Sequence, residues 1–182
     1  MKIVGIASCS HYAWLESSKI MVENLANEVE CGASARVHVP VDSEGLIACM
    51  SESDYFIIHT HGTFDSFIDQ RANDKQVKIA SLSDVENFPS FPNLKLVIIT
   101  ACSTAGGENS NNIAAALSTK IAKNGLVIAN RYRVFGSCYD FGEEGGKQGW
   151  IGYRNGKAVL FEKDLPANIT MADGYKIYRA NN

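Results

Sequence analysis

Two apolar segments of the sequence end in residues that can carry out nucleophilic chemistry. The first, FIIHTHG, ends on His61 and Gly62, and the second, LVIITACSTAGG, reaches Cys102 and continues into small residues. A cysteine attacks a carbonyl group as the thiolate, and a nearby imidazole can accept the thiol proton. The backbone N–H groups of Gly62 and Cys102 would then face the developing oxyanion. The pattern favours acyl transfer by a Cys102–His61 pair, whereas Cys102 taken alone also fits a buried structural thiol.

Two further histidines stand close to this pair in the expected fold. His59 lies two residues before His61, so on an extended strand the two side chains point to the same face of the sheet. His59 is therefore a candidate partner of His61, and the alternative is a histidine hydrogen-bonded within the layers of the protein. His11 follows the first expected strand and is a candidate for the wall of the same cleft.

Charged residues near the fifth expected strand suggest two opposite kinds of substrate pocket. The acidic residues Asp140, Glu143 and Glu144 would bind an Arg or Lys side chain, and this is the interpretation we follow for Asp140 and Glu143. Arg131 and Arg133 would instead receive an acidic side chain. Both sets also fit an ordinary solvated surface.

The elements that must position these residues alternate between strands and helices. Short apolar, β-branched runs predict strands at 2–8, 35–41, 54–62, 94–102 and 126–136. Helical spacing predicts helices at 11–29, around 43–53, from 81 to 88 and at 111–125. This order is typical of a mostly parallel sheet with helices on both faces, in which ligands gather at the carboxyl ends of the strands. If the third and fourth strands are parallel neighbours, His61 and Cys102 lie at the same edge of the sheet.

The C-terminal third of the chain has a different pattern. Residues 140–149 form a glycine-rich, acidic segment that predicts a loop. Asn155 and Gly156 separate two strand-like runs, which is a strong signal for an antiparallel hairpin with a type I′ turn. The segment YKIY at 175–178 is a candidate for a last strand.

A His-Gly that ends one apolar strand, followed roughly forty residues later by an Ala-Cys that ends another, resembles the caspase-like cysteine peptidases. That fold includes caspases, legumains, separase, gingipains, clostripain and CHAT domains, and the resemblance covers roughly residues 1–140. It implies a three-layer α/β sandwich with a mostly parallel central sheet, here followed by the C-terminal hairpin. It also implies His61 as general base, Cys102 as nucleophile, and an oxyanion site at the backbone amides near Gly62 and Cys102.

The resemblance implies a cysteine endopeptidase with a polypeptide substrate. The alternative is the same fold used without catalysis, as an interaction or regulatory module. A flavodoxin-like nucleotide or flavin binder would also explain the alternation of strands and helices. It would not explain why His-Gly and Ala-Cys end two of the strands.

Composition and charge narrow the remaining classes of function and of binding partner. The net charge of −3, with no Lys/Arg cluster among aromatic residues, gives no support for a nucleic-acid partner. No apolar run reaches the roughly 18–20 residues that span a bilayer, so we expect no membrane partner. The dispersed cysteines show no metal-ligand spacing, so we expect neither a metal nor another cofactor. The sequence predicts one domain over residues 1–182, in the reducing cytoplasm, and leaves the oligomeric state open.

Overall fold

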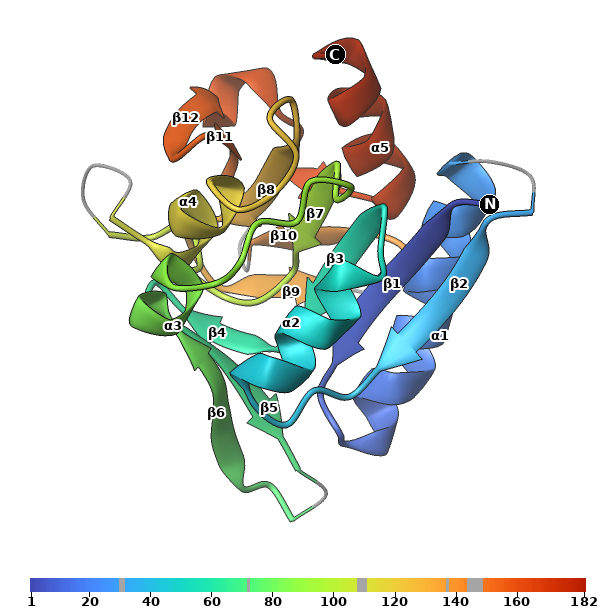
Figure 1. The fold of residues 1–182 in the computed structure, drawn as a ribbon, viewed down its shortest axis with the longest axis vertical. Helices are drawn as coiled ribbons and strands as arrows, with labels where there is room; N and C mark the ends of the chain where they lie inside the picture. The colour runs from blue at the N-terminus through green and yellow to red at the C-terminus, as the bar shows by residue number, and fades with distance from the viewer. Residues whose placement is uncertain (30–31, 72, 108–110, 137, 144–148) are drawn as a thin grey trace.

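A seven-stranded sheet forms the centre of the computed structural model, which describes residues 1–29, 32–71, 73–107, 111–136, 138–143 and 149–182 (Figure 1). Its strands are β1 (Ile3–Ser8), β2 (Ser34–His38), β3 (Tyr55–His59), β7 (Leu96–Ile99), β8 (Leu126–Asn130), β11 (Trp150–Arg154) and β12 (Lys157–Leu160), in the order β12-β11-β8-β7-β3-β1-β2. The pairs from β2 to β8 are parallel, and β11 and β12 add an antiparallel hairpin. The mostly parallel sheet with a C-terminal hairpin is therefore confirmed.

Helices cover both faces of this sheet (Figure 1). They are α1 (Tyr12–Val29), α2 (Ser43–Ser51), α3 (Leu82–Glu86), α4 (Ile113–Ser118) and α5 (Met171–Ala180), with a short 3-10 helix at Glu162–Asp164. In β7, Leu96 and Ile98 join one apolar core with α1 and α5, whereas Val97 and Ile99 join the other with α2 and α4. A strand that is covered on both faces reads as a continuous apolar run, which explains the sequence pattern.

Two small antiparallel sheets continue from the carboxyl ends of the central strands. One contains β4 (His61–Thr63), β5 (Ser66–Gln70) and β6 (Gln76–Ser81), and the other contains β9 (Val134–Gly136), β10 (Phe141–Glu143) and β13 (Asn168–Ile169). The strands expected at 54–62 and 126–136 are therefore each divided. The first part stays in the central sheet, and the second part belongs to a small sheet. His61 lies on the second part.

Several local expectations need correction. Residues 175–178 are helical, because α5 begins with a capping box in which the side chains of Thr170 and Asp173 bind each other's backbone N–H groups. The helix expected at 111–125 ends after Ser118, and its start is capped by Asn112. The segment at 140–149, expected to be a loop, contains strand β10 at Phe141–Glu143. Strand β5 was absent from the expected elements. The hairpin turn is confirmed, since Asn155 and Gly156 both have positive φ, as a type I′ turn requires.

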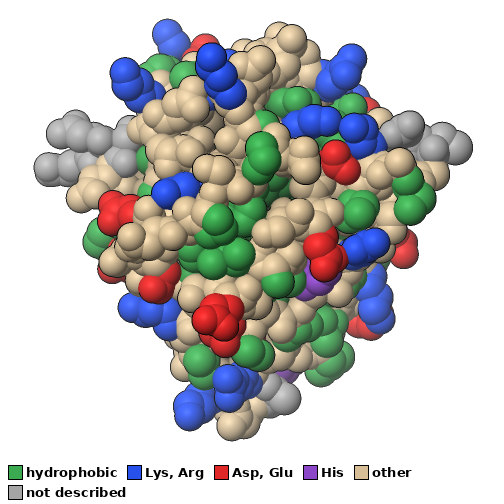
Figure 2. Space-filling view, viewed as in Figure 1, with side chains coloured by type: hydrophobic (Ala, Val, Ile, Leu, Met, Phe, Trp, Pro, Cys, Tyr) green, Lys and Arg blue, Asp and Glu red, His purple; other side chains and the backbone are tan. Residues whose placement is uncertain are grey.

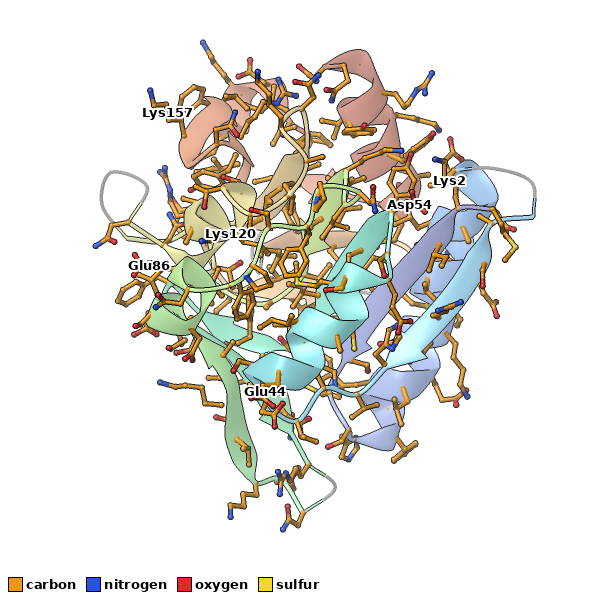
Figure 3. The ribbon with its side chains drawn as sticks, in the orientation of Figure 1. Lys2, Glu44, Asp54, Glu86, Lys120 and Lys157 are labelled. Carbon is orange, nitrogen blue, oxygen red and sulfur yellow. The ribbon has the colours of Figure 1, made fainter. Side chains whose placement is uncertain are left out.

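Charged groups join elements away from the carboxyl edge of the sheet (Figure 3). Asp54, before β3, accepts a hydrogen bond from the Ile3 backbone and lies within 4 Å of the ammonium groups of Lys2 and Lys95. Lys120 donates to the Glu86 carbonyl at 2.7 Å and so links α4 to α3. On the face shown in Figure 2, basic and acidic side chains are intermixed. Among the described residues, no helix is long and apolar enough to cross a membrane.

Candidate active site

A pocket of about 370 Å³ lies at the carboxyl edge of the central sheet. Both His61 and Cys102 line it, together with residues from the first turns of α1, from the ends of β3 and β7, and from β9 and β10. Strands β3 and β7 are parallel neighbours, so their chain continuations leave the sheet side by side. The two residues that the sequence pairs therefore contribute to one cavity.

Gly62 is in close contact with the turn that carries Cys102. A Cβ atom at Gly62 would lie 2.8 Å from the Cβ of Ala101, 2.9 Å from the Cγ2 of Thr104 and 3.1 Å from the carbonyl oxygen of Cys102. Real Cβ atoms do not approach carbon atoms this closely, because optimal carbon–carbon contacts are about 3.5–4.0 Å. The absence of a side chain at Gly62 therefore lets β4 lie against the turn at 101–104.

Cys102 is half-buried at the start of a tight turn. Ser103, which follows it, has a φ of 56° and donates its backbone N–H to the Tyr132 carbonyl at 2.7 Å. The Cys102 thiol accepts a hydrogen bond from the Val134 N–H at 3.4 Å and faces the Val134 carbonyl at 3.7 Å. In the parts of the chain that the structure describes, the Cys102 N–H has no hydrogen-bond acceptor. Helix α4 begins at Ile113, close to the start expected at residue 111.

His61 is held by an amide from the neighbouring strand. The Nε2 atom of His61 lies 2.5 Å from the side-chain oxygen of Gln70. The Gln70 amide nitrogen donates to the Asp74 carboxylate at 3.0 Å, and because a carboxylate only accepts, this contact fixes which end of the amide faces His61. His61 therefore carries its proton on Nε2, and Nδ1 is left as the acceptor.

The strand that carries Gln70 is anchored to the loop between β1 and α1. Asp69 is almost fully buried and accepts hydrogen bonds from the backbone N–H of Ser10 at 2.7 Å and from the Ser10 hydroxyl. The Gln70 N–H donates to the Cys9 sulfur at 3.3 Å, and the His11 N–H donates to the Gln70 carbonyl at 3.0 Å. These contacts fix the position of β5, and thereby the position of the amide that holds His61.

His59 lines the inner part of the pocket and is fully engaged. The Nδ1 atom of His59 lies 2.8 Å from the Thr100 hydroxyl, which also contacts the Ile58 carbonyl. The Nε2 atom lies 3.0 Å from the Ser17 hydroxyl, which also contacts the Trp14 carbonyl. Burial, and secondarily the nearby His61, lowers the pKa of His59 to about 4, so this ring is neutral at pH 7. Of the two interpretations of His59 drawn from the sequence, a hydrogen-bonded histidine within the layers of the protein describes this residue better than a partner of His61.

Trp14 is one of the pocket residues that the sequence did not place at the site. Its ring centroid lies 4.6 Å from the ring centroid of His59 and 4.8 Å from that of His61. It belongs to the first turn of α1, directly after β1 ends at the same edge of the sheet as β3. An aromatic residue in that position was the available signal, but we used Trp14 only as part of the helical apolar pattern.

The four described cysteines differ in their exposure. Cys9 is fully buried, and burial raises the pKa of its thiol to about 11. Burial also raises the pKa of Cys49. Cys138 is half-buried and packs against the apolar core on the α1 side of the sheet. Cys102 alone among these thiols lines the pocket.

The charged candidates for substrate binding lie in different places. Arg133 lines the pocket, and Arg131 pairs instead with Glu162 at 3.0 Å. Asp140 is exposed before β10 and is not among the residues that line the pocket. The backbone of Glu143 belongs to β10, whereas its side chain and Glu144 lie outside the described residues. His11 stacks on Tyr12, and its side chain does not reach the pocket.

The described parts of the chain contain no group of three His, Cys, Asp or Glu side chains placed to hold a metal ion. No family model matches the chain, and a search of the curated proteins finds no match. What the site can do therefore has to be argued from its own geometry. That geometry places a thiol and a histidine at one pocket, and among the described residues neither the His61 Nδ1 atom nor the Cys102 N–H has a hydrogen-bond partner.

Proposed function

We propose that the chain is a caspase-like cysteine peptidase, with Cys102 as nucleophile and His61 as general base. The main support is that Cys102 and His61 line one pocket, at the ends of two adjacent parallel strands, with Gly62 against the Cys102 carbonyl. The strand order β2-β1-β3-β7-β8, with helices on both faces, is the support for a caspase-like sandwich. The proposal keeps the cytoplasmic location expected from the sequence, since dispersed thiols stay reduced in that compartment.

The reaction follows from the protonation state of His61. The thiol leaves Val134, gives its proton to the Nδ1 atom of His61, and attacks the peptide carbonyl carbon as the thiolate. The N–H groups of Gly62 and Cys102 donate to the oxyanion of the tetrahedral intermediate. The imidazolium then protonates the leaving amine, and a thioester remains on Cys102. A water molecule that loses its proton to His61 hydrolyses this thioester and restores the free thiol.

Thiol labelling tests the proposal directly. Iodoacetamide should modify Cys102 at pH 7 faster than Cys9 and Cys49, because burial holds both of those thiols in the neutral form. Mass spectrometry after peptide digestion locates the modified residue. The His61→Ala variant should slow the labelling of Cys102 without changing that of Cys9.

Turnover supplies the second test. The protein should cleave a mixed library of fluorogenic peptides, and Cys102→Ala should abolish cleavage while circular dichroism shows an intact fold. Cys49→Ala is the matched control, and it should retain full activity because Cys49 lies on α2, outside the pocket. Cleavage that persists in Cys102→Ala would refute the peptidase. Slow, equal labelling of all thiols would favour a non-catalytic interaction module.

A further inference from the structure

The pocket beside Cys102 has an inner part made of buried residues and a mouth made of exposed ones. Among the lining residues, His59, Thr60, Thr100 and Phe141 are buried, whereas Arg133 and Phe135 are exposed. A volume of about 370 Å³ falls within the usual range for ligand pockets, about 300–1,000 Å³. A substrate side chain that enters this pocket therefore reaches the buried residues of its inner part.

The inner part is uncharged, and its hydrogen-bonding atoms are already used. Both ring nitrogens of His59 have protein partners, Thr100 on one side and Ser17 on the other. The low pKa of His59 keeps the ring neutral across the physiological range. A carboxylate or ammonium group buried there would lose its hydration without gaining a counter-charge, which is costly. The inner wall therefore disfavours every charged side chain.

The walls of the pocket favour a large apolar side chain. Trp14 and Phe141 both contact the ring of His59, with centroid distances of 4.6 Å and 5.7 Å. Phe135 is 76% exposed on β9 and adds a third aromatic ring at the mouth. Aromatic rings pack well against one another in tilted and edge-to-face arrangements, and they bury large apolar areas.

The mouth of the pocket offers no acidic partner for a basic side chain among the lining residues that the structure describes. Besides the histidines, Arg133 is the one charged residue among the described residues that line the pocket, and none of them is Asp or Glu. An acidic side chain would meet Arg133 only at the exposed mouth, where solvent weakens the attraction.

We propose that the peptidase cleaves after a large uncharged apolar residue, and most efficiently after an aromatic one, whose side chain packs against Trp14, Phe135 and Phe141. This inference rests on the proposed peptidase function. It assigns to the pocket the binding of a substrate side chain, a role separate from the chemistry of Cys102 and His61. It also replaces the acidic pocket at Asp140 and Glu143 with an apolar one.

A matched substrate panel tests the proposal. Fluorogenic tetrapeptides that differ only in the residue before the scissile bond, Phe, Leu, Ala, Asp, Asn or Arg, are compared by kcat/KM with the full chain. The Phe and Leu substrates should exceed the Asp and Arg substrates about tenfold or more. Preferred cleavage after Asp, Asn or Arg that depends on Cys102 would overturn the specificity and leave the peptidase intact. No cleavage of any substrate, with Cys102 unreactive to iodoacetamide, would overturn both.

Two variants test the walls separately. Phe135→Ala should raise KM about tenfold for the Phe substrate, leave kcat unchanged, and have little effect on the Ala substrate. Phe161→Ala is the control, since Phe161 is a half-exposed phenylalanine outside this pocket. An unchanged KM for the Phe substrate in Phe135→Ala would refute the proposed packing.

The inner wall is tested by adding a charge. Ser17→Asp places a carboxylate beside His59, and it should raise the ratio of Arg to Phe cleavage about tenfold. Ser17→Asn has the same shape without the charge and should leave the ratio unchanged. An Arg-to-Phe ratio that is equal in the two variants would show that the substrate side chain does not reach this wall.

Discussion

Replacing Gly62 with alanine tests whether the contact between β4 and the Cys102 turn sets the geometry of the site. The new methyl group would lie 2.8 Å from the Cβ of Ala101, about 0.7 Å inside the roughly 3.5 Å minimum for an optimal carbon–carbon contact. Ala101 and Thr104 are fully buried and cannot move aside easily. Strand β4 is at the edge of its sheet, so β4 is the element that has to shift.

This displacement sets the expected losses of stability and of catalytic rate. Forcing an extra methyl group into a packed contact costs about 1–3 kcal/mol, so we expect the unfolding free energy to fall by about 2 kcal/mol. His61 precedes Gly62 and would move with it relative to Cys102. A misplacement of about 1 Å between reacting groups can lower the rate about 100-fold. The variant should therefore fold and lose most of its kcat/KM.

Urea denaturation and peptide cleavage measure the two quantities on the same sample. Gly45→Ala is the matched control, because its nearest neighbour, an Asp42 side-chain oxygen, lies at 3.3 Å and α2 is remote from the pocket. The control should keep its kcat/KM and change the unfolding free energy by less than about 1 kcal/mol. Wild-type stability together with wild-type kcat/KM in Gly62→Ala would refute the reasoning.

Three further perturbations test other parts of the structure. Gln70→Leu should lower kcat about tenfold or more by releasing His61. Gln70→Glu combined with Asp74→Asn keeps an acceptor oxygen for His61 without facing two carboxylates, and it should restore much of kcat. Equal kcat and equal pH–rate profiles in the two proteins would exclude positioning through this hydrogen bond. The folded-state pKa of His59 lies below its unfolded value of about 6.5, so the stability of the fold is greatest above pH 6.5 and is lost as the pH falls towards 4, by up to about 3 kcal/mol. Urea titrations across this pH range should show the loss, and His59→Gln should remove it. Asn112→Ala removes the side chain that caps α4 and the amide that donates to the Tyr153 hydroxyl. Thermal unfolding should therefore show that the unfolding free energy falls by about 2 kcal/mol.

The central sheet could be predicted from the sequence because its signals are local. β3 and β7 are uninterrupted apolar runs, and each turns polar where the chain leaves the sheet. The hairpin between β11 and β12 was visible in Asn155 and Gly156. The helix α5 was also readable, since Thr170 and Asp173 have the spacing of a capping box, but the apolar residues at 175–178 favoured a strand instead.

Strand β5 could not be predicted, because the contacts that stabilise it lie far away in the sequence. Its segment contains Asp69, and aspartate is a residue type that strands avoid. Asp69 is tolerated because Ser10, 59 positions earlier, satisfies its carboxylate. No pattern within the segment reveals that partner. The amide that holds His61 was missed for the same reason, although His61 itself was found from its place at the end of an apolar run.

The separation of the two histidines explains how neighbouring residues come to differ in role. His59 is the last residue of β3, and its ring is fixed among Ser17, Thr100 and Trp14. His61 is the first residue of β4, and its ring is fixed by Gln70 on a different sheet. If both had remained on one strand, the two rings would have pointed to the same face of the central sheet. Because the chain leaves the central sheet between them, one ring forms the neutral inner wall of the pocket, and the other is held by Gln70 in the position where we propose that it accepts the thiol proton.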